Sequence, residues 1–136
     1  MGETEVLRVL LADDEQDMRG PLRFALELDG RFMVVGEADN GEDAVRAAAA
    51  LQPDAVVLDL ALPVLDGMAA LPLILDVAGA ARVVSGAGDA EDLSRQALAL
   101  GASAYVQKLE FTVVIAALVK GCLHPVPEEA RRSGPR

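Results

Sequence analysis

The sequence predicts an α/β fold in which a parallel sheet is covered by helices on both faces. Apolar runs rich in valine and leucine alternate five times with amphipathic segments of helical period. The first and third runs, at 6–12 and 55–58, are nearly all apolar, which is typical of strands buried on both faces. Because parallel strands need crossover connections, right-handed helical crossovers would then give a doubly wound sheet.

The length of 136 residues suits one compact domain with a core of its own. The hydrophobic fraction of 52% comes from alanine, valine and leucine rather than aromatic residues, and it argues against a disordered chain. We expect the domain to span residues 5–123. Residues 124–136 are rich in proline and charge, and we interpret them as a tail or linker remnant.

The first half of the chain contains two strand and helix pairs. The strand at 6–12 precedes an amphipathic pattern from Met18 to Leu28. Pro21 lies early in that pattern, so we expect this helix to begin late or to bend there. The strand at 32–38 precedes a second helix, whose apolar stripe consists of Ala44, Val45, Ala48 and Leu51.

The second half opens with a third strand at 55–58 and a helix that begins at Asp66-Gly67. Pro72 lies inside this helix and predicts a kink or a short helix. After a fourth strand at 82–85, Asp89 is a candidate N-cap and Gly101 a candidate stop for the fourth helix.

A short fifth strand at 104–107 leads to a last helix, at about residues 111–123, that is unusually apolar. Its apolar side chains cannot all face the sheet (Phe111, Val114, Ile115, Leu118 and Val119). One interpretation is a deeply packed final helix. The other is a surface for a homodimer, or one covered by an output domain that this chain does not contain.

The formal net charge of −10 excludes two classes of partner for this domain. An acidic body is repelled by nucleic acid and by an anionic membrane surface. Cations and basic protein faces are compatible with it, although excess acid also serves solubility alone. Cys122 is the single cysteine, no apolar run reaches the ~18 residues of a membrane helix, and no secretory signal is visible at the N-terminus. We therefore expect a cytoplasmic protein.

Polar residues follow the predicted strands at the edge where parallel sheets form their sites. Asp13-Asp14 follow the first strand, Asp59 the third, Ser85 ends the fourth and Lys108 follows the fifth. Each alone has an ordinary explanation, as a helix cap, a turn residue or a surface lysine. Together they predict a site where carboxylates hold Mg²⁺ and a carboxylate attacks phosphorus, with the hydroxyl and ammonium neutralising phosphoryl oxygens.

Four stretches resemble the CheY-like receiver domains of two-component response regulators. They are VLLADDEQDMR at 9–19, AVVLDLALPVLDGMAAL at 55–71, VVSGAGD at 83–89 and GASAYVQK at 101–108. The resemblance covers about residues 6–123. It implies a flavodoxin-like (βα)5 fold with strand order 2-1-3-4-5.

The resemblance also implies a role for each site residue. Asp59 would be the phosphoacceptor, with Mg²⁺ held by Asp13, Asp14, Asp59 and the backbone carbonyl of Ala61.

Three residues would respond to phosphorylation, by the same resemblance. The Ser85 hydroxyl would turn towards the phosphoryl group while Lys108 pairs with it, and Tyr105 would swing inward. Leu109 stands where many receivers have proline. Ala61 and Ala87 occupy positions that, in the family, tune loss of the phosphoryl group.

The function implied is a signalling phosphoacceptor and not an enzyme with a separate substrate. A cognate histidine kinase would donate the phosphoryl group. The switched surface would act through an absent output domain that regulates transcription, because residues 120–128 resemble the linker of NarL-type regulators. One alternative is a degenerate receiver that only binds proteins. A haloacid-dehalogenase-like phosphatase is disfavoured, because that family has a second aspartate as acid/base two residues after the nucleophile, where this chain has Ala61.

Overall fold

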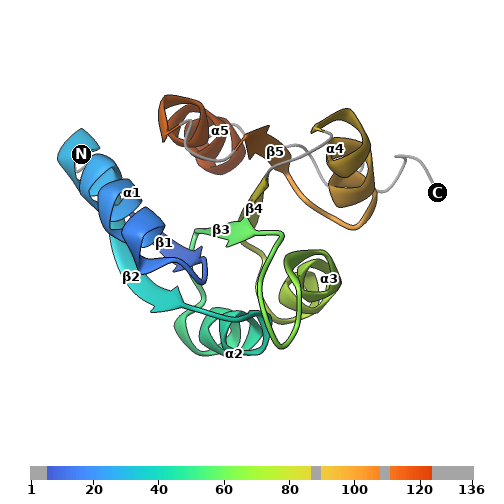
Figure 1. The fold of residues 1–136 in the computed structure, drawn as a ribbon. Helices are drawn as coiled ribbons and strands as arrows, with labels where there is room; N and C mark the ends of the chain where they lie inside the picture. Colours follow the sequence, from blue (N-terminus) through green and yellow to red (C-terminus); the bar gives the residue numbers. More distant parts are fainter. Residues whose placement is uncertain (1–5, 87–89, 108–110, 124–136) are drawn as a thin grey trace.

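The protein forms five alternating strands and helices around one parallel sheet (Figure 1). The structure is a computed structural model that describes residues 6–86, 90–107 and 111–123, with only the backbone described at 81–86, 90–91, 111–112 and 121–123. The elements are β1 (Leu7–Ala12), α1 (Gln16–Asp29), β2 (Phe32–Ala38), α2 (Gly41–Leu51), β3 (Ala55–Asp59), α3 (Gly67–Val77), β4 (Ala81–Gly86), α4 (Ala90–Ala99), β5 (Ala104–Gln107) and α5 (Phe111–Leu123).

The strand order is β2-β1-β3-β4-β5, and every neighbouring pair is parallel. This confirms the predicted fold class and strand order. The chain passes from β1 to β2 on one side and then returns past β1 to β3 on the other side, so the crossovers run in both directions from β1. The carboxyl ends of all five strands therefore meet at one edge of the sheet, and that edge carries the candidate site.

The core consists of two apolar clusters, one on each face of the sheet. Side chains alternate along a strand, so Val9 and Leu11 of β1 point to one face while Leu10 and Ala12 point to the other. The first face is covered by α1 and α5, and the second by α2, α3 and α4 (Figure 1). This double covering explains why the first and third strands were recognisable as nearly continuous apolar runs.

The last helix packs more deeply than an amphipathic surface helix would. Val114 and Leu118 of α5 are buried, and Ile115 and Val119 are partly buried against the same cluster. Val113 is 44% exposed. Most of the described apolar residues of α5 therefore serve the core, in agreement with the first of the two interpretations of this helix.

Helix ends follow local chemistry in most places. The side chains of Asn40 and Asp66 accept hydrogen bonds from the backbone N–H groups of Asp43 and Ala69 and so cap α2 and α3. Gly101 ends α4 with a φ of 111°, as predicted. The candidate cap Asp89 lies outside the described residues.

Of the two expectations for α1, a late start or a bend at Pro21, the late start is wrong and the bend stays a prediction. The helix begins at Gln16, five residues before Pro21, and continues through the proline to Asp29. Leu22 and Leu26 pack on the sheet from the same helix, and this tertiary packing outweighs the hydrogen bond that a proline cannot donate.

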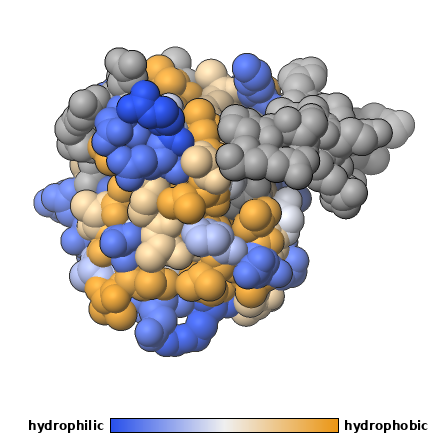
Figure 2. All heavy atoms as spheres, turned by 90° about the vertical axis from the view of Figure 1, so that its right-hand side faces the viewer, coloured by the Kyte–Doolittle hydropathy of each residue, from blue (hydrophilic) through white to orange (hydrophobic). Residues whose placement is uncertain are grey.

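Several leucines in or next to α3 and α4 are exposed, namely Leu73, Leu75, Leu98 and Leu100. Figure 2 shows the right-hand side of the Figure 1 view, where hydrophobic and hydrophilic residues are interspersed. Among the described residues, no helix combines the length and apolar character needed to cross a membrane.

A glycine lets α2 approach the loop that follows β3. A Cβ atom at Gly41, the first residue of α2, would lie 1.7 Å from the carbonyl oxygen of Leu65. Gly41 also donates its N–H to the Pro63 carbonyl at 3.4 Å. Because backbone faces backbone here, no side-chain rotation can make room for a larger residue.

The same substitution should therefore have opposite effects at two glycines. We expect Gly41→Ala to lower the free energy of unfolding by roughly 1–3 kcal/mol, because the loop or the helix must move. Gly20 lies inside α1 with nothing within 4 Å of its Cβ position. Gly20→Ala should raise the free energy of unfolding by about 0.5–1 kcal/mol. Urea unfolding followed by circular dichroism measures both, and a Gly41→Ala variant as stable as wild type would contradict the close contact.

Candidate metal centre at the carboxyl edge of the sheet

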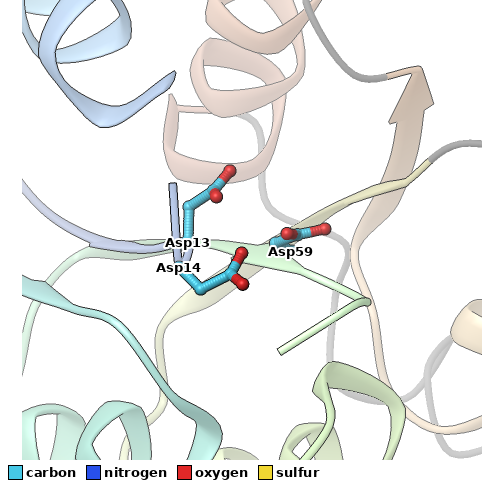
Figure 3. Close-up of side chains that lie close together, drawn as sticks. All are labelled: Asp13, Asp14 and Asp59. Atoms are coloured by element: carbon cyan, nitrogen blue, oxygen red, sulfur yellow. The ribbon is translucent and has the colours of Figure 1, made fainter. Parts of the chain in front are cut away.

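Three carboxylates gather where β1 and β3 end (Figure 3). One oxygen from each of Asp13, Asp14 and Asp59 lies within 4.8 Å of the others. Asp59 is 1% exposed, Asp13 is half-buried and Asp14 is exposed. The cluster is therefore open to solvent on one side and buried on the other.

Strand pairing brings these carboxylates together. Ala12 of β1 is opposite Leu58 of β3, so the next residue on each strand, Asp13 and Asp59, lies at the same edge. All five residues of β3 are buried, which carries the Asp59 carboxylate into the interior with the strand. The sequence-based expectation that Asp13, Asp14 and Asp59 converge is thus met by the described geometry.

Such a cluster suits a small, hard cation. Carboxylates this close repel one another, and a divalent cation among them removes the repulsion. Mg²⁺ prefers oxygen ligands and keeps several waters, so a site that is part buried and part exposed fits it. The three oxygens are near enough for one ion to contact them directly or through water.

The Asp59 carboxylate is oriented by its own loop. Its Oδ1 accepts a hydrogen bond from the backbone N–H of Ala61 at 3.2 Å. A Cβ atom at Gly67 would lie 2.2 Å from the carbonyl oxygen of Asp59, so the start of α3 presses directly against the end of β3. The predicted role of the Ala61 carbonyl stays a prediction.

The turn after β1 is held from several directions. Asp13 donates its N–H to the Ala38 carbonyl at 3.0 Å, and its Oδ1 accepts from the N–H of Glu15 at 2.8 Å. Its backbone carbonyl accepts a hydrogen bond from the Arg19 guanidinium. Asp13 is thus fixed by β2, by its own turn and by α1.

Arg19 belongs to an ion-pair network between α1 and β2. Its Nε lies 2.7 Å from one carboxylate oxygen of Glu37, and Nη1 of Arg23 lies 2.7 Å from the other. Partial burial opposes ionisation of Glu37, but the hydrogen bonds from Arg23 and Arg19 outweigh it and hold the pKa of its carboxyl below its usual value. The network therefore stays charged at neutral pH.

The remaining predicted site residues are described unevenly. Ser85 of β4 is directly opposite Asp59 of β3 in the sheet register, although only its backbone is described. Lys108 and Leu109 lie outside the described residues, as does Ala87. Tyr105 lies on β5 and packs partly buried against the core on the α3 side.

The Tyr105 hydroxyl is buried without a hydrogen-bond partner in the part of the chain that the structure describes. Burial also raises the pKa of its phenol above the ordinary value of 10.0. The aromatic ring therefore lies inward with its polar end poorly satisfied.

Sequence reasoning missed three contributors to the site: Arg19, Glu37 and Gly67. Arg19 stands at the end of the stretch VLLADDEQDMR, but nothing in the sequence identifies its backbone acceptor. Gly67 was noticed only as a helix start. A signal for Glu37 is weak, since an acidic residue near the end of a half-exposed strand is common.

Comparison with known proteins identifies the type of domain. The family model described as "Response regulator receiver domain" matches residues 9–119. A curated relative is the protein-glutamate methylesterase/protein-glutamine glutaminase of Nitrobacter winogradskyi, 37% identical over 85% of this chain and 28% of that protein. The chain thus spans under a third of that relative's length.

Two solved structures are similar across most of the chain. The signal receiver domain of the response regulator NarL from Mycobacterium tuberculosis has a TM-score of 0.80 and 27% identity, covering 96% of this chain and 99% of that one. The CheX-CheY-BeF3-Mg complex from Borrelia burgdorferi has a TM-score of 0.76 and 25% identity, covering 84% and 87% of the two chains.

Val64 adopts a backbone conformation that its side chain disfavours, with a φ of 69° in the loop between β3 and α3. Because its side chain is 77% exposed, little packing would be lost by replacing it. We expect Val64→Asn to raise the free energy of unfolding by about 0.5–1 kcal/mol, since asparagine tolerates this region better. Val64→Ala removes the β-branch but has no side-chain amide for local hydrogen bonding, so it should gain less. Denaturant titration compares the two, and no gain in either variant would argue against strain at this position.

Removing the Tyr105 hydroxyl should stabilise the protein. We expect Tyr105→Phe to raise the free energy of unfolding by about 1 kcal/mol at neutral pH, because it removes a buried hydroxyl that has no partner among the described residues. The raised phenol pKa makes wild type lose stability above pH 10, where the unfolded chain ionises before the folded one. The difference in free energy of unfolding between Tyr105→Phe and wild type should therefore grow above pH 10. Urea titrations below and above pH 10 measure this, and a destabilised variant would indicate a hydrogen-bonded hydroxyl.

Proposed function

Since the chain belongs to the response regulator receiver domain family, we propose that Asp59 accepts a phosphoryl group from a histidine kinase. The observation that carries the proposal is the cluster of Asp13, Asp14 and Asp59, with Asp59 buried at the end of a central strand. If Asp59 were only a turn residue, there would be no reason to expect two further carboxylates within 4.8 Å of it.

The transfer is a displacement at phosphorus. An oxygen of the Asp59 carboxylate forms a bond to phosphorus while the phosphorus–nitrogen bond of the donor phosphohistidine breaks, and the freed imidazole takes up a proton. The Ala61 N–H, bound to Oδ1, orients the carboxylate during the attack. The reaction needs positioning and charge neutralisation more than covalent help from other groups.

Asp13, Asp14, Asp59 and the backbone carbonyl of Ala61 would hold Mg²⁺. The bound ion would supply positive charge to the oxygens of the transferring group. The complex of the similar CheY from Borrelia burgdorferi contains BeF3 and Mg, which supports the assignment of this cation. The site's mixed burial supports it independently.

Ser85 and Lys108 are proposed to respond to the added charge. A phosphoryl group brings about −1.5 to −2 charges, which draw a hydroxyl and an ammonium towards it. The register that sets Ser85 opposite Asp59 supports this role for Ser85. Tyr105, two strands away from Asp59 on β5, would report the change at the surface formed by α4, β5 and α5.

The partner and the output are proposals of the same kind. The kinase would meet the domain in the cytoplasm, and a homodimer would use the exposed side of α5, where Val113 lies. The relative from Nitrobacter winogradskyi is a methylesterase, whereas the NarL-type resemblance of residues 120–128 favours transcriptional output. The domain itself is proposed to act as a phosphoacceptor with no separate substrate to turn over.

The phosphoacceptor assignment predicts one decisive substitution. With acetyl phosphate and Mg²⁺, we expect mass spectrometry to detect a phosphoryl adduct on wild type, and Asp59→Asn to reduce it below detection, because an amide is not a nucleophile here. Asp66→Asn is the matched control. Asp66 lies in the same loop and is exposed, and asparagine still caps α3, so its adduct should equal that of wild type.

Three outcomes would go against the proposal. An Asp59→Asn adduct at the wild-type level would mean another acceptor. A wild-type adduct that forms equally well when Mg²⁺ has been chelated beforehand would show that the reaction does not need the metal. A wild type that takes up neither acetyl phosphate nor beryllofluoride would favour the degenerate receiver, which only binds proteins.

A further inference from the structure

The turn that carries two of the three carboxylates is held by a guanidinium outside the carboxylate cluster. We propose that Arg19 is a positioning residue for the metal site, because it holds the peptide that joins Asp13 to Asp14. The inference rests on the proposed Mg²⁺ site and goes beyond it, since it assigns a role to a residue that binds neither the cation nor the phosphoryl group.

The contact from Arg19 is made to the backbone carbonyl at the turn after β1, which sets the direction of the chain there. Arg19 donates to the backbone carbonyl of Asp13. A peptide unit is planar, so this carbonyl and the N–H of Asp14 can only turn together. Holding the carbonyl therefore fixes the direction in which Asp14 leaves the turn, and with it the approach of the Asp14 carboxylate to Asp13 and Asp59.

Asp14 is held through the backbone of its turn and not by packing, because its side chain is exposed. One of these backbone contacts is local: the Glu15 N–H donates to Asp13 Oδ1 at 2.8 Å and closes the turn around Asp14. The Arg19 contact is the other, and it reaches back from the first turns of α1 to the carbonyl of the peptide that joins Asp13 to Asp14.

Arg19 is itself well positioned for the task. Its side chain is only 14% exposed, and Nε is bound to Glu37 at 2.7 Å while Nη1 reaches Asp13. The planar fork of a guanidinium can make both contacts at a fixed spacing, which an ammonium cannot. A depression of about 260 Å³, lined by Arg19, Glu37, Ala38, Asp39 and Asp43, adjoins the network and gives a loosened side chain room to move.

Electrostatics alone would give Arg19 the opposite effect on Mg²⁺. A positive charge beside a cation site weakens cation binding through Coulomb repulsion. If charge were its main influence, removing it would tighten Mg²⁺ binding. If positioning dominates, removal weakens binding despite the lost repulsion, so the sign of the change separates the two effects.

Arg23 offers a matched control within the same helix. It is one turn further along α1 and pairs with the same carboxylate, with Nη1 2.7 Å from Glu37. No described hydrogen bond joins it to the turn after β1. Loss of Arg23 therefore removes a positive charge and an ion pair with Glu37 but leaves the Asp13 carbonyl contact in place.

The test measures Mg²⁺ affinity by isothermal titration calorimetry for wild type, Arg19→Met, Arg19→Lys and Arg23→Met. We expect both Arg19 variants to weaken Mg²⁺ binding by about tenfold, as is typical when a group that orients a metal ligand is removed. Arg23→Met should stay within about twofold of wild type. Arg19→Lys keeps the charge, so its loss of affinity would come from geometry.

Two further readouts separate positioning from general damage to the fold. Urea unfolding without Mg²⁺ should show that both Arg19→Met and Arg23→Met are fully folded under the conditions of the titration, with the larger loss for Arg19→Met, which also gives up the Asp13 carbonyl contact. Amide NMR should show the Asp14 signal shifted in the Arg19 variants before any metal is added, and little changed in Arg23→Met.

Several results would overturn the inference. Tighter Mg²⁺ binding by Arg19→Met would make charge the dominant effect, and unchanged binding by both Arg19 variants would leave no positioning role. If Arg23→Met weakened Mg²⁺ binding as much as the Arg19 variants do, loss of the ion pairs with Glu37 would explain the effect without any contact to Asp13. The proposed Mg²⁺ site is tested separately. If wild type binds no Mg²⁺, or binds it as tightly after Asp14→Asn, the proposed site itself fails, and this result differs from any failure of the Arg19 inference.

Discussion

Asp59 ends a strand in which every residue is buried, and its carboxylate is therefore held where an uncompensated charge is costly. That constraint determines what can surround it. The Ala61 N–H meets one oxygen, and two more carboxylates at the end of β1 make the neighbourhood attractive to a cation. The buried strand provides rigidity, while the exposure of Asp14 on the opposite side of the cluster leaves a route from solvent. A reacting carboxylate needs both, because it must be fixed in direction and reachable by a donor.

Tight backbone packing confines movement on one side of Asp59. Gly67 brings the start of α3 against the Asp59 carbonyl, and Gly41 brings α2 against the Leu65 carbonyl in the same loop. Neither contact has a side chain that could yield. The proposed response to a charge at Asp59 would therefore come from the other side, from β4 and β5, where Ser85 is in register with Asp59 and the Tyr105 hydroxyl has no hydrogen-bond partner among the described residues. Asymmetric packing thus gives the proposed switch its direction.

Much of this arrangement could be predicted from the sequence because it depends on periodicity and on strand ends. Apolar runs located β1 and β3, and parallel pairing then required Asp13, Asp14 and Asp59 to converge. The start of α1 was mispredicted, because Pro21 is tolerated by a helix whose Leu22 and Leu26 pack on the sheet. The Arg19 contact could not be predicted, since its acceptor is a backbone carbonyl that any residue could present. Likewise, the left-handed conformation of Val64 contradicts the preference of valine.

The carboxylate cluster and the arginine network have opposite effects on the same turn. Three acidic groups within 4.8 Å push the end of β1 and the end of β3 apart when no cation is bound. The contacts from Ala38, Glu15 and Arg19 to Asp13 oppose that separation and keep the ligands near their binding geometry. A cation then needs to order less of the chain when it binds, so more of its interaction energy appears as affinity. Glu37 contributes to this balance, because its carboxylate accepts from Nε of Arg19 while Nη1 of the same guanidinium reaches the Asp13 carbonyl.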